Sequence, residues 1–212
     1  MFSCARILIL ACGLVGGFAP NAFAQSVEVP LPESAQENET TKTVAKVKPP
    51  FELAKDLDGL FVQLGRTRDA KLADRISSRI WETWQTSDSR SVDLLTRWAR
   101  EASGNQRYGV ALDLLDQVVA LRPGYAEGFN QRATLHFMME NYGKSIADIE
   151  RTLALEPRHY GALAGLASIF EQLNKKEEAL ETWYRTLSIY PAMKSAQDSV
   201  VRLEEELAGS GI

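Results

Sequence analysis

The chain has 212 residues, of which 45% are hydrophobic and 25% charged, with a formal net charge of −4, and this composition is ordinary for a folded protein with one core. Acidic and basic residues are interleaved, so the sequence lacks the one-sided basic field with which proteins bind nucleic acid or anionic lipid. We therefore expect no nucleic-acid partner.

Residues 1–24 have the organisation of a secretory signal peptide. One positive charge, Arg6, precedes the apolar run "ILILACGLVGGFA", and "AFA" at 22–24 forms a small-x-small cleavage site. The apolar run is too short and wrongly flanked for a permanent membrane anchor. We expect cleavage after Ala24 and a periplasmic or secreted mature protein that is not inserted in a membrane.

Both cysteines, Cys4 and Cys12, lie in this leader, so the mature chain has no thiol for a disulfide, a nucleophile or a zinc site. An alternative is that "ILAC" at 9–12 resembles a lipoprotein signal in which Cys12 becomes the lipidated first residue. Five apolar residues separate Arg6 from Cys12, whereas the apolar region of a signal usually has about 7–15. The sequence therefore favours Cys12 as an apolar member of the leader.

Residues 25–50 follow as a linker rich in Pro, Glu, Thr, Lys and Gln, without an aromatic residue. Such a segment cannot bury enough apolar area to offset the entropy of ordering it. We expect a disordered tether here and a helical domain over 51–208, with 209–212 as a tail.

An internal repeat organises the helical domain. "LRP", "LEP" and "IYP" end at Pro123, Pro157 and Pro191, which are spaced 34 residues apart. Placing each proline at position 32 of a unit gives repeats at 92–125, 126–159 and 160–193. Proline ends a helix because it has no N–H and its ring clashes with a continuing turn.

Other columns of this register repeat as well. Position 8 is Ala99, Ala133 and Ala167, position 20 is Ala111, Ser145 and Ala179, and position 24 is Leu115, Ile149 and Trp183. Small residues recur where two helices must approach closely, and large apolar residues recur where the gap is filled. The pattern predicts packed helical hairpins, and no segment has the alternation of a strand.

The register extends in both directions. A divergent first unit is expected at 58–91, where Leu64, Ser77, Trp81 and Trp84 fall on repeat columns, although Ser89 replaces the final proline. Residues 194–208 predict a final helix whose acidic face covers the last hairpin and keeps the array soluble. Asn174, with Glu177 three residues later, predicts a capping box at a helix start.

The two histidines do not form a metal or catalytic pair. His159 is position 34 of its unit and is expected in a structural joint between hairpins, and His136 at position 11 is expected in the core. The four tryptophans, Trp81, Trp84, Trp98 and Trp183, are interpreted as packing residues. We expect no catalytic residue, no cofactor and no metal.

This pattern resembles the tetratricopeptide repeat, a 34-residue helix–turn–helix unit with small residues at positions 8 and 20 and proline at 32. The resemblance covers residues 58–193, although the family's aromatic and glycine positions are mostly not matched. It implies an all-α fold, a right-handed superhelical solenoid of antiparallel helix pairs with a concave face lined by the first helices.

The resemblance also implies a site. In the family, a partner polypeptide lies in the concave face and contacts the side chains at positions 2, 5, 9, 12 and 13. On this sequence those positions give Asp93, Thr96, Arg100, Ser103, Glu127, Asn130, Thr134, Phe137, Met138, Ser168, Glu171 and Gln172. Arg100 and Asn130 supply only a fragment of the two-lysine, two-asparagine clamp with which a chaperone-adaptor subfamily holds a C-terminal carboxylate, so that activity is not predicted.

The sequence therefore predicts a non-enzymatic scaffold or adaptor of the bacterial periplasm that binds a protein or peptide partner through its concave face. It resembles short secreted repeat proteins of alphaproteobacteria. A lipid-anchored structural component of an envelope assembly is the alternative, and an enzyme with an unrecognised site is a third hypothesis.

Overall fold

A computed structural model describes residues 50–209, with side chains from Leu57 onward. The predicted signal peptide, the state of Cys12, the linker up to residue 49 and the last tail residues lie outside the described residues. The described chain contains nine helices and no strand: α1 Pro50–Arg66, α2 Ala70–Trp84, α3 Arg90–Gly104, α4 Tyr108–Leu121, α5 Ala126–Met138, α6 Tyr142–Leu155, α7 Tyr160–Gln172, α8 Lys176–Ile189 and α9 Lys194–Gly209. The predicted all-α solenoid of helix pairs is confirmed.

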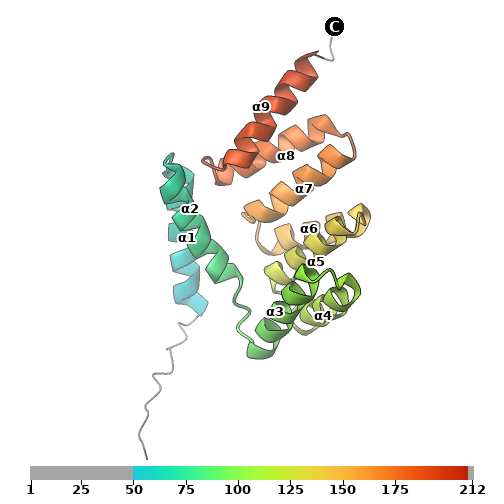
Figure 1. Ribbon diagram of the computed structural model, residues 1–212. Coiled ribbons are helices and arrows are strands. Elements are labelled where there is room, and N and C mark those ends of the chain that lie inside the picture. The colour runs from blue at the N-terminus through green and yellow to red at the C-terminus, as the bar shows by residue number, and fades with distance from the viewer. Residues whose placement is uncertain (1–49, 210–212) are drawn as a thin grey trace, which may run out of the picture. The chain divides into compact units, whose positions relative to one another are not determined.

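Helices α3 to α8 form three antiparallel pairs that follow one another along the chain (Figure 1). Within each pair the two helices pack closely, and the second helix of one pair contacts the first helix of the next. The last helix, α9, packs on α8 and buries Val200 and Leu203 against the apolar residues of α7 and α8. Within the described residues, no helix is long and apolar enough to span a membrane.

The small residues of the sequence register lie at the closest approach of each pair. Ala99 and Ala111 share one buried cluster, and Ala167 and Ala179 share another. In the middle pair the Ser145 hydroxyl donates a hydrogen bond of 2.8 Å to the carbonyl oxygen of Ala133. A larger side chain at any of these positions would separate the two helices, so the column of small residues is what allows the pairs to form.

The turn inside each pair is closed by backbone geometry. Gln106, Glu140 and Asn174 occupy equivalent positions, and all three have left-handed φ values of 57°, 58° and 56°. Around Glu140, the N–H of Asn141 donates to His136 O and the N–H of Glu140 to Phe137 O, which is a Schellman closure of α5. Glycine or asparagine usually occupies this position because other side chains crowd the backbone there.

The capping box predicted at Asn174 is therefore wrong. Asn174 closes the end of α7 in the left-handed conformation, and helix α8 starts after Lys175, whose side chain makes no capping hydrogen bond. Asparagine is favoured at helix starts and in left-handed turns alike. The sequence signal was real, but it belonged to the end of one helix and not to the beginning of the next.

The α1–α2 hairpin packs on the turns before α7 and after α8. Its buried apolar residues form one cluster with Tyr160 and Tyr190, and its members from the hairpin are Leu60, Phe61, Leu64, Ala73, Ile76, Ile80 and Trp84. Polar contacts reinforce this packing: the Ser77 hydroxyl lies 2.8 Å from the Tyr160 hydroxyl, and Arg158 donates to Asp58 at 2.7 Å. The hairpin is thereby joined to residues about 80 to 100 positions later in the chain.

Gly161 is required for this docking. A Cβ atom at this position would lie 2.8 Å from the indole ring of Trp81, closer than side chains tolerate. The absence of a side chain therefore lets α2 approach the first turn of α7.

Three of the four tryptophans pack as predicted, and Trp98 does not. Trp84 and Trp183 are buried and Trp81 is partly buried, whereas Trp98 remains 47% exposed on α3. The sequence register places Trp98 at position 7 of its unit, where it was expected to pack. Helix α2 instead meets α3 at its own C-terminal end, where Arg100 donates to Gln85, and leaves Trp98 uncovered.

Candidate functional site

A groove of about 320 Å³ lies between the end of α2 and helices α3 and α5. Its lining combines polar side chains, one exposed cation and apolar side chains: Trp81, Gln85, Ala99, Arg100, Ser103, Leu115, Glu127, Asn130, Gln131, Thr134 and Leu135. Two successive first helices of the repeat thus form the floor, and α2 forms a wall that comes from outside the well-matched repeats.

Most of the residues expected on the concave face gather here or beside it. The groove contains Arg100, Ser103, Glu127, Asn130 and Thr134. A second hollow of about 110 Å³, between α5 and α7, shares Asn130 and Thr134 and adds Phe137 and Ser168. Met138 is exposed, with its sulfur 4.0 Å from the Ser103 hydroxyl at the rim of the groove.

Four expected residues lie elsewhere. Thr96 is buried and its hydroxyl bonds to the Val92 carbonyl oxygen of the same helix. Asp93 accepts hydrogen bonds from the backbone and hydroxyl of Ser87, which fixes the start of α3.

At the other end of the repeats, Glu171 accepts a hydrogen bond of 2.6 Å from the Trp183 indole and pairs with Arg202. It therefore ties α7 to α8 and α9. Gln172 is exposed and lines neither hollow.

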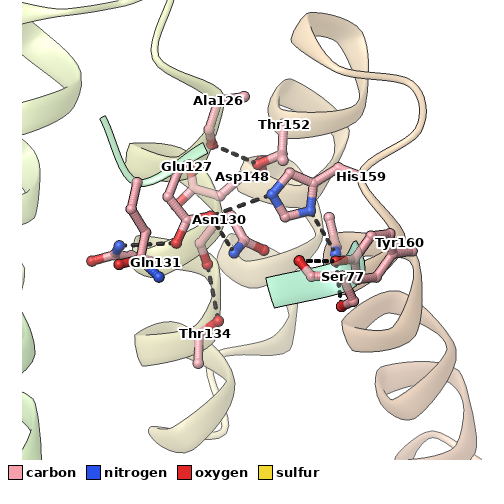
Figure 2. A network of polar contacts seen from close by, with 12 residues as sticks. Ser77, Ala126, Glu127, Asn130, Gln131, Thr134, Asp148, Thr152, His159 and Tyr160 are labelled. Atoms are coloured by element: carbon pink, nitrogen blue, oxygen red, sulfur yellow. Dashed lines mark hydrogen bonds and ion pairs between the residues drawn. The ribbon is translucent and has the colours of Figure 1, made fainter. Parts of the chain in front are cut away.

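A buried carboxylate organises the polar side of the groove. Glu127 is 4% exposed, and its oxygens accept hydrogen bonds from the side-chain amides of Asn130 and Gln131, both at 2.9 Å. The imidazole Nε2 of His159 lies 3.3 Å from the same carboxylate (Figure 2). Because a buried charge is tolerated when it is fully hydrogen-bonded, this cluster fixes the orientation of both amides.

His159 occupies the joint between the second and third pairs, as the sequence predicts, and it links three parts of the molecule. Its Nδ1 accepts a hydrogen bond of 3.0 Å from the backbone N–H of Ala162 and so caps α7. A neutral imidazole that accepts at Nδ1 carries its proton on Nε2, so this nitrogen donates to Glu127. The ring stacks on Trp84 with centroids 4.0 Å apart and planes 9° from parallel.

Three groove residues with aromatic or amide side chains, Trp81, Gln85 and Gln131, were not among the site residues expected from the sequence. Trp81 lies edge-on to His159, with ring centroids 5.5 Å apart, and Gln85 accepts a hydrogen bond of 2.9 Å from Arg100 Nη1. The repeat pattern places α2 as a preceding unit, and no local signal shows that its end reaches the groove. Gln131 is position 6 of its unit, which is not among the positions that the family uses.

His136 lies in the core, as predicted, beside a separate polar hollow between α4, α5 and α6. There Arg132 forms two hydrogen bonds to Asp148, at 2.8 and 2.7 Å, and one of 2.8 Å to Asp116. Burial of the His136 ring lowers its pKa. Within the described residues, no three histidine, cysteine, aspartate or glutamate side chains gather as a metal site.

Comparison with known proteins identifies clear relatives. A family model described as tetratricopeptide repeat matches residues 130–193. A TPR repeat-containing protein of Rhizobium etli is 42% identical over 197 residues, which cover 93% of this chain and 95% of the relative.

Solved structures share the fold at low identity. The first TPR domain of Spaghetti (RPAP3), bound to an HSP90 peptide, superposes with a TM-score of 0.54 at 20% identity, covering 57% of this chain and 95% of the domain. A crystal structure of MamA gives a TM-score of 0.52 at 20% identity, covering 68% of this chain and 85% of that one.

The Glu127 cluster provides a test of the site's geometry. Glu127→Gln replaces one acceptor oxygen with an amide donor that faces other donors, so we expect the free energy of unfolding to fall by about 1–3 kcal/mol. Urea unfolding followed by circular dichroism measures it. Glu101→Gln, the same substitution at an exposed position, should change the free energy of unfolding by no more than about 0.5 kcal/mol. Equal effects at both positions would show that Glu127 does not organise the groove.

Proposed function

Because this chain belongs to the tetratricopeptide-repeat family, we propose that it is a non-enzymatic adaptor that binds a partner polypeptide in the groove between α2, α3 and α5. The observation that carries the proposal is the convergence of Arg100, Asn130 and Thr134 on one open groove. Side chains from two successive first helices meet there, as recognition of an extended segment requires.

The lining of the groove fits a peptide. Arg100, Ser103 and Thr134 present hydrogen-bonding groups, while Ala99, Leu115 and Leu135 line the groove as almost fully buried apolar residues. The second hollow lies one first helix further along and offers Phe137 beside small residues. Polypeptides bring main-chain polar groups and apolar side chains in alternation, so a surface of this kind is suited to them.

The most chemically capable side chains of the site are engaged in holding helices. Glu127 accepts from two amides and contacts His159, and His159 in turn caps α7 and stacks on Trp84. A general acid or base must reach a substrate proton. The fixed positions of this carboxylate and this imidazole therefore support a binding role over a catalytic one.

Among the solved relatives, the RPAP3 domain is described as bound to an HSP90 peptide, which supports a peptide as the kind of partner. The groove of the present chain differs from a double carboxylate clamp, because its cation is Arg100 and its amides Asn130 and Gln131 are bonded to Glu127. We therefore propose peptide binding without proposing chaperone tails as partners.

The proposal includes a periplasmic location, which the leader over residues 1–24 supports. The intact mass of the protein purified from its native host tests it. A mature chain that begins at Gln25 is the expected result. A lipidated N-terminus at Cys12 would favour instead the anchored structural component of an envelope assembly.

Photo-crosslinking in cells tests the groove directly. A benzophenone amino acid at Thr134, which is exposed and lines both hollows, should yield covalent adducts with a partner polypeptide. The same probe at Gln117, an exposed position of α4 outside the groove, is the control.

Adducts at Thr134 that are absent at Gln117, and that disappear in Arg100→Glu, are the expected outcome. Arg97→Glu, an equal charge change on an exposed residue of the same helix, should leave them intact. The same adducts from both probe positions, or none from Thr134, would contradict the proposed groove.

A further inference from the structure

Resting on the proposed function, we infer that the partner is an acidic peptide segment whose carboxylate binds Arg100 against the wall formed by Trp81 and Gln85 of α2. The α1–α2 hairpin then belongs to the binding site and determines which partner fits. The chemical class of the partner is an internal aspartate or glutamate with its neighbouring main chain, and a free C-terminus is not required.

The wall is a fixed part of the molecule. Trp84 stacks on His159, and Tyr160 contacts Ser77 through its hydroxyl. On the other side of the hairpin, Tyr190 donates a hydrogen bond of 2.8 Å to Asp74. Asp74, Ser77 and Trp84, which make these contacts, are spread over almost three turns of α2, so they fix its direction as well as its position. A partner that enters the groove meets Trp81 and Gln85 as a preformed surface.

Arg100, on α3, is the cation of the groove, and it lies against this wall. A guanidinium has five N–H donors, and the contact of Nη1 with Gln85 Oε1 uses one of them. No carboxylate of residues 57–209 forms an ion pair with Arg100, in contrast to Arg132 and Arg158, which are paired. Gln85 thus orients the guanidinium without neutralising it, and a carboxylate is the group that binds such a fork most strongly.

A second unpaired group lies across the groove. The Nε2 of Gln131 donates to Glu127, which fixes the direction of the amide, and its Oε1 is buried without a hydrogen-bond partner in the described chain. An unsatisfied buried acceptor destabilises the free protein. Gln131 is partly exposed and lines the groove, so a turn of its side chain would bring this oxygen to a main-chain N–H beside the bound carboxylate, which supplies the missing donor. A peptide therefore complements both sides of the groove, which a simple anion does not.

Binding of synthetic peptides tests the inference on the mature protein, residues 25–212. The probe is a library of decapeptides, acetylated and amidated so that neither end is charged, followed by fluorescence anisotropy on the selected sequences. We expect the selected peptides to share an aspartate or glutamate. Replacing that residue with its amide should weaken binding by about tenfold or more.

Exposed positions of the protein give variants that leave the buried contacts intact. Gln85→Glu places a carboxylate beside Arg100. Because the two side chains then form an ion pair within the protein, the affinity for acidic peptides should fall by about tenfold or more. Arg100→Glu should shift selection to peptides with lysine or arginine. Gln117→Glu and Arg97→Glu, which carry the same charge changes outside the groove, should keep the affinity of the wild type.

The outcomes separate this inference from the proposed function. Capped peptides that bind without an acidic residue, or with equal affinity to wild type and Gln85→Glu, would overturn the inference and leave peptide binding intact. Peptides that bind only with a free C-terminal carboxylate would overturn it too. A library that gives no binder, together with no adduct from the probe at Thr134, would overturn the proposed function itself.

Discussion

The stack of the Trp84 indole on the His159 imidazole is the interaction on which the rest of the molecule depends. The two rings lie nearly parallel with centroids 4.0 Å apart, and His159 is fully buried beneath the hairpin. The same imidazole caps α7 and contacts Glu127 on α5. One side chain thus joins three elements: the hairpin, the second pair and the third pair. A neutral ring with two differently bonded nitrogens is suited to this task.

The groove exists because the contacts of His159 with Trp84, α7 and Glu127 hold α2 in place. With Trp84 stacked on His159, Trp81 lies one turn before it and Gln85 directly after it at the C-cap of α2, and both face α3 and α5. Gly161 provides the space that this approach needs. The position of the wall, the orientation of Arg100 through Gln85 and the alignment of the amides by Glu127 therefore have a common structural origin.

The sequence predicted the parts of the fold that depend on local spacing. The prolines and the small residues at positions 8 and 20 indicated the three pairs, and Ala133 and Ser145 do meet where the register places them. It also predicted five residues of the groove, because successive first helices bring equivalent positions together. These features depend on contacts between helices that are adjacent in the sequence, and such contacts recur at a constant spacing of residues.

The docking of the α1–α2 hairpin depends on contacts between residues far apart in the sequence, and the 34-residue spacing does not predict them. Ser77 and Tyr160 are 83 residues apart, and Tyr190 and Asp74 are 116 apart. Trp81 and Trp84 fit the columns of a stacked repeat as well as they fit the surface around His159, so the register alone did not distinguish the two arrangements. The exposed Trp98 and the two missed residues of the wall, Trp81 and Gln85, have this single cause.

A double-mutant cycle on the ring stack measures the central interaction most directly. Trp84→Leu keeps an apolar side chain without the indole, and His159→Asn keeps a side chain able to cap α7 without the imidazole. Unfolding free energies of the wild type, both single variants and the double variant give the coupling between the two rings. The structure predicts a favourable coupling of about 0.5–1.5 kcal/mol. Strictly additive effects would contradict the account, because they would mean that the hairpin is not held on the repeats through these two rings.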